Sequence, residues 1–202
     1  MTPAALEAIA LSIPHMGARS IGNSLRTWAA ESKNTNIVEA GCWLGAGTAF
    51  LALGAMESGS EIHAYDRWHA NHSEVEKAQA FGIKLRPGEN TLPRVRATLK
   101  PFPVRITFHR GSIAGAEWTF GPIGVYVDDA SKRAQAFRRA REIFWPSLTD
   151  GAVIVLMDYH HYEKWGDAYR AQHDYITGHS DQFTLIEERM AGTAAAAFRY
   201  TK

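Results

Sequence analysis

The alternation of short apolar runs with stretches of helical pattern limits what this chain can fold into more than any other feature. The strand-like runs cover residues 36–40, 61–66, 104–110, 121–129, 151–158, 182–189 and 194–201. Helices are expected between them, over residues 46–59, 72–81, 92–99, 131–145 and 163–176. Strands that alternate with helices in this way predict a parallel sheet with helices on both faces.

The last two runs differ from the others because no crossover helix fits between them, so they must pair antiparallel. We therefore predict an α/β fold with a doubly wound, Rossmann-like, mostly parallel seven-stranded sheet and an antiparallel C-terminal hairpin. A length of 202 residues suits a single domain, residues 1–202. Within it, residues 1–35 are expected to form an N-terminal helical cap, and residues 67–100 a helical insertion.

The composition argues against several classes of partner. The formal net charge is +1, which disfavours a nucleic-acid partner held by bulk charge. No apolar run approaches the roughly 20 residues that a membrane helix needs, and the N-terminus lacks the basic region of a signal peptide. The single cysteine, Cys42, cannot form an internal disulfide and fits a reducing compartment. We expect a soluble, cytoplasmic protein without nucleic-acid or membrane partners.

Polar side chains follow the apolar runs at nearly every predicted strand end, where open α/β sheets bind their ligands. These side chains belong to Glu39, Asp66, Ser112 (which follows Gly111), Asp128, Asp129, Asp158, His160 and His161. Any one of the acids could simply cap the following helix. Their convergence on one edge of the predicted sheet favours a binding site.

A glycine-rich stretch, VEAGCWLGAGT, contains the end of the first run and limits which kinds of ligand the site could bind. A phosphate-binding P-loop requires a lysine that is missing after Gly45 and Gly47. A dinucleotide fingerprint requires a small residue where Phe50 stands, because helix and strand approach closely there. An NAD-dependent oxidoreductase is therefore a weaker alternative.

Taken in order, these motifs make the chain resemble the class I S-adenosylmethionine-dependent methyltransferases. The matches are VEAGCWLGAGT, the acid of IHAYD, the Gly-Ser of FHRGSI, the acids of VYVDD and the run LTDGAVIVLMDY. Trp43 replaces a glycine that is frequent in the family. The resemblance implies S-adenosylmethionine as cofactor, bound by Glu39, Gly41, Trp43, Gly45, Thr48, Asp66, Arg67, Gly111, Ser112 and Asp128.

The chemistry of these residues suits that cofactor. Backbone N–H groups of a glycine loop and a helix N-terminus suit the carboxylate of the methionine moiety, and Glu39 suits its ammonium group. The carboxylate of Asp66 can accept hydrogen bonds from two vicinal ribose hydroxyls. Arg67 or Trp68 could cover the adenine face, although a tryptophan at this position could equally belong to the core.

Within that superfamily the pattern is similar to small O-methyltransferases of the macrocin and catechol type. Those enzymes hold a divalent metal on the acid of the fourth strand and on paired acidic or amide groups after the fifth. This chain keeps Asp128 and Asp158, but Met157 occupies a position where an acid is common, and Tyr159 follows. Because Mg²⁺ needs oxygen ligands, we expect no metal site in this chain. The alternative is a Mg²⁺ ion bound by the two carboxylates together with the substrate.

Without a metal, the acceptor oxygen needs a base. His160 and His161 follow Asp158, and histidine is the side-chain type suited to proton transfer near neutral pH, although paired loop histidines can also be merely solvated. With Asp128 they form the expected catalytic group. We predict O-methylation of a small-molecule acceptor or sugar, by a chain that could form a homo-oligomer. A non-catalytic cofactor-binding module on the same fold is a further alternative.

Overall fold

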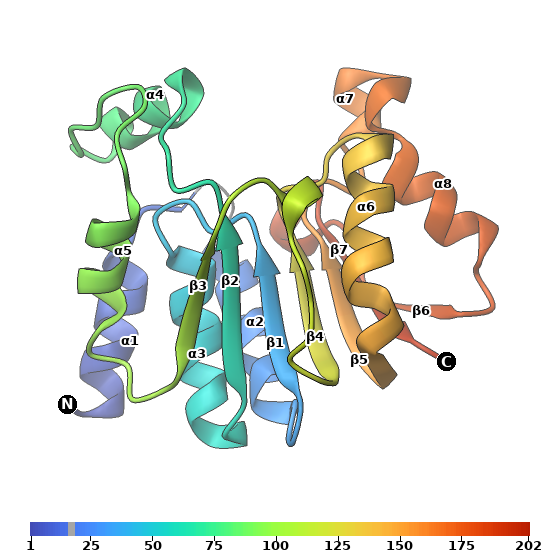
Figure 1. Ribbon diagram of the computed structural model, residues 1–202, viewed down its shortest axis with the longest axis horizontal. Helices are drawn as coiled ribbons and strands as arrows, with labels where there is room; N and C mark the ends of the chain where they lie inside the picture. The colour runs from blue at the N-terminus through green and yellow to red at the C-terminus, as the bar shows by residue number, and fades with distance from the viewer. Residues whose placement is uncertain (16–18) are drawn as a thin grey trace.

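The computed structural model describes residues 1–15 and 19–202 and contains the predicted sheet (Figure 1). Its strands are β1 (Asn36–Ala40), β2 (Glu61–Asp66), β3 (Ile106–Arg110), β4 (Ile123–Asp128), β5 (Leu148–Leu156), β6 (Phe183–Glu187) and β7 (Ala196–Tyr200). Its α-helices are α1 (Pro3–Ser12), α2 (Arg19–Glu31), α3 (Ala46–Ser58), α4 (His72–Ala80), α5 (Leu92–Leu99), α6 (Ala134–Phe144), α7 (Tyr162–Trp165) and α8 (Ala171–Gly178).

The seven strands lie in the order β3-β2-β1-β4-β5-β7-β6. All neighbours are parallel except β7, which pairs antiparallel with both β5 and β6. The doubly wound sheet with an antiparallel C-terminal hairpin is thus confirmed. The strand order reverses between β1 and β4, and such a switch point opens a crevice at the carboxyl ends of the strands.

Helices cover both faces of the sheet and form two apolar clusters with it. One cluster joins side chains of α1, α2, α3 and α5 to the sheet, and the other joins α6 and α8 to the opposite face. Figure 1 shows α4 and α7 at the end of the molecule toward which the arrowheads of β1 and β2 point. Residues 67–100, predicted as a helical insertion, contain α4 and α5. No helix in the described ranges has the length and apolar character needed to cross a bilayer.

Two predicted helices differ from those observed. The helix expected over residues 131–145 begins only at Ala134, because the preceding residues form a turn around the Asp128 carboxylate. The helix expected over residues 163–176 is wrong as one element, since it is divided into α7, a short 3₁₀ turn and α8. Gly166 separates α7 from the turn with φ 80° and ψ −178°, a conformation that no helix accommodates.

The helices α2 and α3 pack closely enough that a glycine is required between them. A Cβ atom at Gly54 of α3 would lie 2.1 Å from the Arg26 carbonyl oxygen of α2 and 2.7 Å from the Ala29 Cβ. The first neighbour is backbone and cannot move aside as a side chain does. The glycine therefore sets the distance between α3, which follows the glycine loop, and the N-terminal helices.

We predict that Gly54→Ala lowers the free energy of unfolding by at least about 1–3 kcal/mol, the usual cost of overpacking. Urea denaturation measures the change. Gly178→Ala is the matched control because a Cβ there meets no atom within 4 Å, so its stability should stay within about 0.5 kcal/mol of the wild type. Equal stability of Gly54→Ala and the wild type would contradict this packing.

Candidate active site

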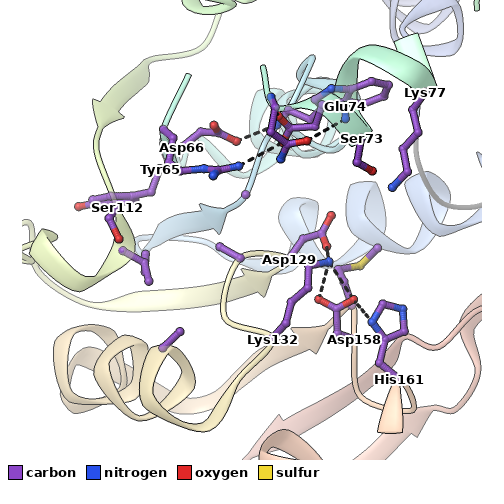
Figure 2. Close-up of a pocket in the computed structure, with 18 of the residues that line it drawn as sticks. Tyr65, Asp66, Ser73, Glu74, Lys77, Ser112, Asp129, Lys132, Asp158 and His161 are labelled. Carbon is purple, nitrogen blue, oxygen red and sulfur yellow. Dashed lines mark hydrogen bonds and ion pairs between the residues drawn. The ribbon is translucent and has the colours of Figure 1, made fainter. Parts of the chain in front are cut away.

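A cavity of about 600 Å³ opens at the carboxyl ends of the central strands (Figure 2). Its walls come from the loops after β1, β2, β3, β4 and β5, together with α4. Of the predicted site residues, those that line it are Gly41, Trp43, Asp66, Arg67, Gly111, Ser112 and His161. The crevice expected from the strand order is therefore present and has a volume typical of small-molecule sites.

Asp66 holds the glycine loop in place. Its Oδ2 accepts hydrogen bonds from the backbone N–H groups of Cys42 (2.8 Å) and Trp43 (2.9 Å), and its Oδ1 accepts one from Trp68 N–H (2.8 Å). The carboxylate thus joins the end of β2 to the loop after β1. Trp68 itself is fully buried, and its Nε1 donates to the His109 carbonyl, so its ring belongs to the core and not to the cavity.

Trp43 forms a wall shared by two cavities. It adopts a left-handed backbone conformation with φ 47°, the region in which glycine is ordinarily found. Its side chain is buried, lines the main cavity and a second one of about 90 Å³, and meets the Phe81 ring edge-on at 6.5 Å. The loop therefore accommodates tryptophan by placing it in the wall that the two cavities share.

The glycines of the loop serve different purposes. A Cβ at Gly41 would lie 2.8 Å from the carbonyl carbon of Asp129, so this glycine allows the loops after β1 and β4 to approach. A Cβ at Gly47 would lie 2.2 Å from Glu39 Oε1. Gly45 precedes α3 with φ 87°, and a Cβ there would face Val95 of α5 and not the cavity.

Glu39 is buried under the loop at the edge of the smaller cavity. Burial raises the pKa of its carboxyl from 4.5 to about 7, and a hydrogen bond from the Thr48 hydroxyl opposes part of the rise. Thr48 is fully buried and lines neither cavity. Its structural role is to orient Glu39, which leaves the other oxygen of the carboxylate beside Gly47.

Asp128 lies outside both cavities, contrary to the expectation that it would contact ligands. Its Oδ1 accepts from Ala130 N–H (3.1 Å) and Ser131 N–H (2.8 Å), and its Oδ2 accepts from the hydroxyls of Tyr126 and Ser131. Burial raises its pKa, and the hydrogen bonds from Ser131 oppose the rise. Asp128 shapes the turn before α6, and the next residue, Asp129, lines both cavities instead.

Beside Asp129, a chain of charged groups crosses the cavity wall (Figure 2). The ammonium nitrogen of Lys132 lies 3.3 Å from Asp129 Oδ1 and 3.0 Å from Asp158 Oδ2. His161 Nδ1 lies 2.7 Å from Asp158 Oδ1. Burial lowers the pKa of Lys132, but the Asp129 and Asp158 carboxylates outweigh it and raise that pKa above its ordinary value. Burial raises the pKa of Asp129 to about 6 against the opposing effect of Lys132.

The two adjacent histidines have different surroundings. His161 lines the main cavity, whereas His160 does not. His160 is buried, with Nδ1 3.0 Å from Glu163 Oε1 and Nε2 3.3 Å from Glu188 Oε1. The structure therefore brings only the second of the paired histidines to the site.

The opposite wall carries the polar groups that follow β2 and β3. Arg67 is exposed and pairs with Glu74 of α4 at 3.5 Å. Gly111 has φ 145°, and a Cβ there would meet no atom within 4 Å. Ser112 accepts a hydrogen bond from Ala114 N–H and lines the cavity. Tyr65, which the motifs did not single out, also lines this wall, and its hydroxyl donates a hydrogen bond to the Glu117 carbonyl.

The residues at the rim do not fit a divalent metal. Only two carboxylates, Asp129 and Asp158, face each other there, and the Lys132 ammonium already lies between them. Of their chain neighbours, Met157 supplies no oxygen ligand, and the Tyr159 ring packs on Phe198. Over the described ranges, no three His, Cys, Asp or Glu side chains gather as a metal-binding group.

The doubly wound sheet with a glycine loop at its switch point defines an α/β protein that binds a nucleotide-like ligand. Residues 38–159, more than half of the chain, match a family described as a methyltransferase domain. The chain belongs to this methyltransferase family, whose cofactor is S-adenosylmethionine. The suspected class is thus confirmed, and the alternative of an NAD-dependent oxidoreductase finds no support.

Comparison with solved structures shows the same fold at low sequence identity. The O-methyltransferase NovP is 13% identical, with a TM-score of 0.66 over 91% of this chain and 80% of NovP. The TDP-rhamnose 3′-O-methyltransferase CalS11 is 12% identical, with a TM-score of 0.60 over 90% of this chain and 78% of CalS11. An rRNA methylase from Streptococcus thermophilus is 17% identical, with a TM-score of 0.59 over 93% of this chain and 100% of the methylase. A search of curated proteins found no match.

The buried carboxyl of Glu39 makes a prediction about pH. Folding raises the pKa of this carboxyl from 4.5 to about 7. Below pH 4.5 the carboxyl is protonated in both states and does not change the free energy of unfolding. As the pH rises through 7, the cost of ionising it in the folded state lowers that free energy. The full difference corresponds to about 3 kcal/mol. Glu39→Gln removes this ionisation, so the free energy of unfolding of the wild type, measured relative to Glu39→Gln, should fall by that amount between pH 4.5 and pH 8.

Urea denaturation across this pH range, without cofactor, tests the prediction. Glu76→Gln, which changes an exposed glutamate of α4, is the matched control and should follow the wild-type profile. Parallel pH profiles for the wild type and Glu39→Gln would show that ionisation of Glu39 does not destabilise the folded state.

Proposed function

We propose that this protein transfers a methyl group from S-adenosylmethionine to a hydroxyl oxygen of a small molecule, a sugar included. The observation that carries the proposal is the pairing of His161 with the buried carboxylate of Asp158 at the cavity wall, 2.7 Å apart. Asp129 and Met157 line the same cavity and also the smaller one. A proton acceptor therefore faces the space that adjoins the glycine loop.

The cofactor is proposed to lie along the loop from β2 to β1. Asp66, Gly111 and Ser112 would surround its adenosine, since Gly111 leaves open space beside it and Asp66 retains acceptor capacity on Oδ1. Glu39 would attract its ammonium group from the smaller cavity. The indole N–H of Trp43 is buried without a hydrogen-bond partner, and a ligand acceptor at this wall would satisfy it.

His161 is proposed as the general base. The His161 Nδ1 atom lies close to Asp158 Oδ1 but without hydrogen-bond geometry. In the tautomer proposed here Nδ1 carries the proton, and Nε2 is unprotonated and able to accept the proton of the acceptor hydroxyl. When bound, S-adenosylmethionine would supply the methyl group from its sulfonium sulfur: the acceptor oxygen would bond to the methyl carbon as the carbon–sulfur bond breaks, and the electron pair would leave with sulfur in S-adenosylhomocysteine. The carboxylate of Asp158 stabilises the imidazolium that His161 becomes. Reactant positioning supplies much of the remaining rate.

The acceptor class rests on two arguments. The cavity of about 600 Å³ has charged side chains of both signs on its walls, including Glu74, Asp129 and Lys132. Such a mixed lining is unlike the basic stripe that binds phosphate backbones. NovP and CalS11, which share the fold, are O-methyltransferases by name, although a fold shared with an rRNA methylase makes RNA the competing acceptor to be tested.

A radiolabel experiment separates these acceptors. The enzyme is incubated with methyl-labelled S-adenosylmethionine and either the low-molecular-weight filtrate of a cell extract or purified ribosomal RNA. We expect label in alkali-stable products of the filtrate and none in the RNA. Label in RNA alone would contradict the small-molecule assignment but not the methyltransferase activity. Absence of transfer to either, with cofactor binding intact, would indicate a non-catalytic module.

We predict that His161→Ala lowers turnover of the acceptor found in this way by roughly 10²- to 10⁴-fold, the usual contribution of a general base. His160→Ala should retain turnover within a few-fold, since His160 does not line the cavity. Production of S-adenosylhomocysteine measures both, and thermal unfolding establishes that both variants are folded. Full turnover by His161→Ala would refute the base assignment.

We also predict that cofactor binding releases a proton. At pH 6.5 the Glu39 carboxyl, with a pKa of about 7, is largely protonated, and an adjacent ammonium group would lower that pKa. Calorimetric titration with S-adenosylhomocysteine in two buffers of different ionisation enthalpy reports the release. Glu39→Gln should bind more weakly and release less. Identical proton release from Glu39→Gln would place the ammonium elsewhere.

A further inference from the structure

The turn between β4 and α6 aims a lysine at the place where two carboxylates meet. Asp128 accepts hydrogen bonds from two amides and one hydroxyl of residues 130–131, and Gln172 Nε2 of α8 donates to the Ser131 carbonyl at 3.3 Å. The turn is thereby tied to both β4 and α8. Lys132 follows directly, and its side chain extends into the cavity.

The ammonium group bridges the two acids instead of pairing with one. It lies 3.3 Å from Asp129 Oδ1, and 3.1 Å and 3.0 Å from the two oxygens of Asp158. The Asp158 side chain is only 4% exposed, so its charge needs a partner, whereas Lys132 is 43% exposed and reaches the open cavity. Two of its three N–H bonds can serve the carboxylates, which leaves the third for a ligand.

A divalent cation on the same carboxylates would have to lie about 2.0–2.6 Å from their oxygens. That position is the one the ammonium group fills, and two like charges in contact there would repel strongly. From this geometry, and resting on the proposed function, we infer that Lys132 is a built-in cation that stands in for a divalent metal and stabilises the negative charge on the acceptor oxygen.

The charged groups around the acceptor then have distinct roles. His161 Nε2 takes the proton from the acceptor hydroxyl, and the Lys132 ammonium donates a hydrogen bond to the oxygen as negative charge develops on it. Lys132 keeps its own proton throughout. Asp129 and Asp158 hold the ammonium in place, and Asp158 also orients His161. Methyl transfer by this chain therefore needs no added metal ion.

The first test measures metal binding directly and requires no acceptor. Mn²⁺ binding is followed by electron paramagnetic resonance for the wild type, Lys132→Ala and the control Lys100→Ala, which removes an exposed lysine after α5. We expect no stoichiometric Mn²⁺ site in the wild type or the control. Lys132→Ala should gain one site, because the two carboxylates lose their cation, and Lys132→Ala with Asp158→Asn should lose it again.

The second test measures turnover on the acceptor identified above. Chelation with EDTA should leave the wild type unchanged. Lys132→Ala should lose roughly 10²- to 10³-fold, as on removal of an oxyanion-stabilising donor, and Mg²⁺ or Mn²⁺ should restore part of the loss. Lys132→Gln replaces the ammonium group by a neutral amide on a side chain one atom shorter and serves as a second variant if Lys132→Ala does not fold.

Three results would overturn the inference: one Mn²⁺ bound per wild-type chain, loss of wild-type turnover in EDTA, or a folded Lys132→Ala that gains no Mn²⁺ site. The metal-binding result holds whatever the reaction is. If no acceptor is methylated but Lys132→Ala gains the Mn²⁺ site, the proposed function fails while the ammonium is still shown to occupy a cation position. If methylation occurs but depends on a metal, only the role of Lys132 fails.

Discussion

The carboxylate of Asp66 is the interaction on which the geometry of the site depends. It takes hydrogen bonds from three backbone amides, at Cys42, Trp43 and Trp68, and so ties the loop after β1 to the end of β2. A hydrogen bond to a charged group contributes about 1.5–3 kcal/mol, enough to keep Trp43 in a left-handed conformation that costs of order 1–3 kcal/mol. With the loop in this shape, the same acid can serve structure and ligand together.

A second carboxylate, Asp128, does for the loop after β4 what Asp66 does for the loop after β1. Both acids end a strand. Asp66 accepts from amides of the loop after the neighbouring strand β1 and from Trp68 N–H, whereas Asp128 accepts from amides of its own following turn. Asp66 lines the cavity, whereas Asp128 is fully buried. The difference lies in the residues that follow Asp128, because Asp129 and Lys132 line the cavity while Asp128 does not.

Most of the fold follows from the sequence pattern, because strand and helix periodicity and the length of the final connection leave few arrangements. The rim was also predictable, since the carboxyl ends of parallel strands share one edge. The sequence pattern could not predict which residue of an adjacent pair faces the cavity. Asp128 and Asp129, or His160 and His161, are chemically alike, and only the turn conformation selects Asp129 and His161. The break at Gly166 was not predicted either, because an isolated glycine is often tolerated in a helix.

The charge arrangement has a consequence for the kind of acceptor. A divalent ion at Asp129 and Asp158 would bind two oxygens of a substrate at once and so favour vicinal hydroxyls. An ammonium group with one free N–H has no such requirement, because it donates a single hydrogen bond to a single oxygen. Under the proposed function, a chain with Lys132 in this place would therefore suit acceptors with one reactive hydroxyl. Their selection falls to the surrounding walls, where Tyr65, Arg67 and Lys77 line the rest of the cavity.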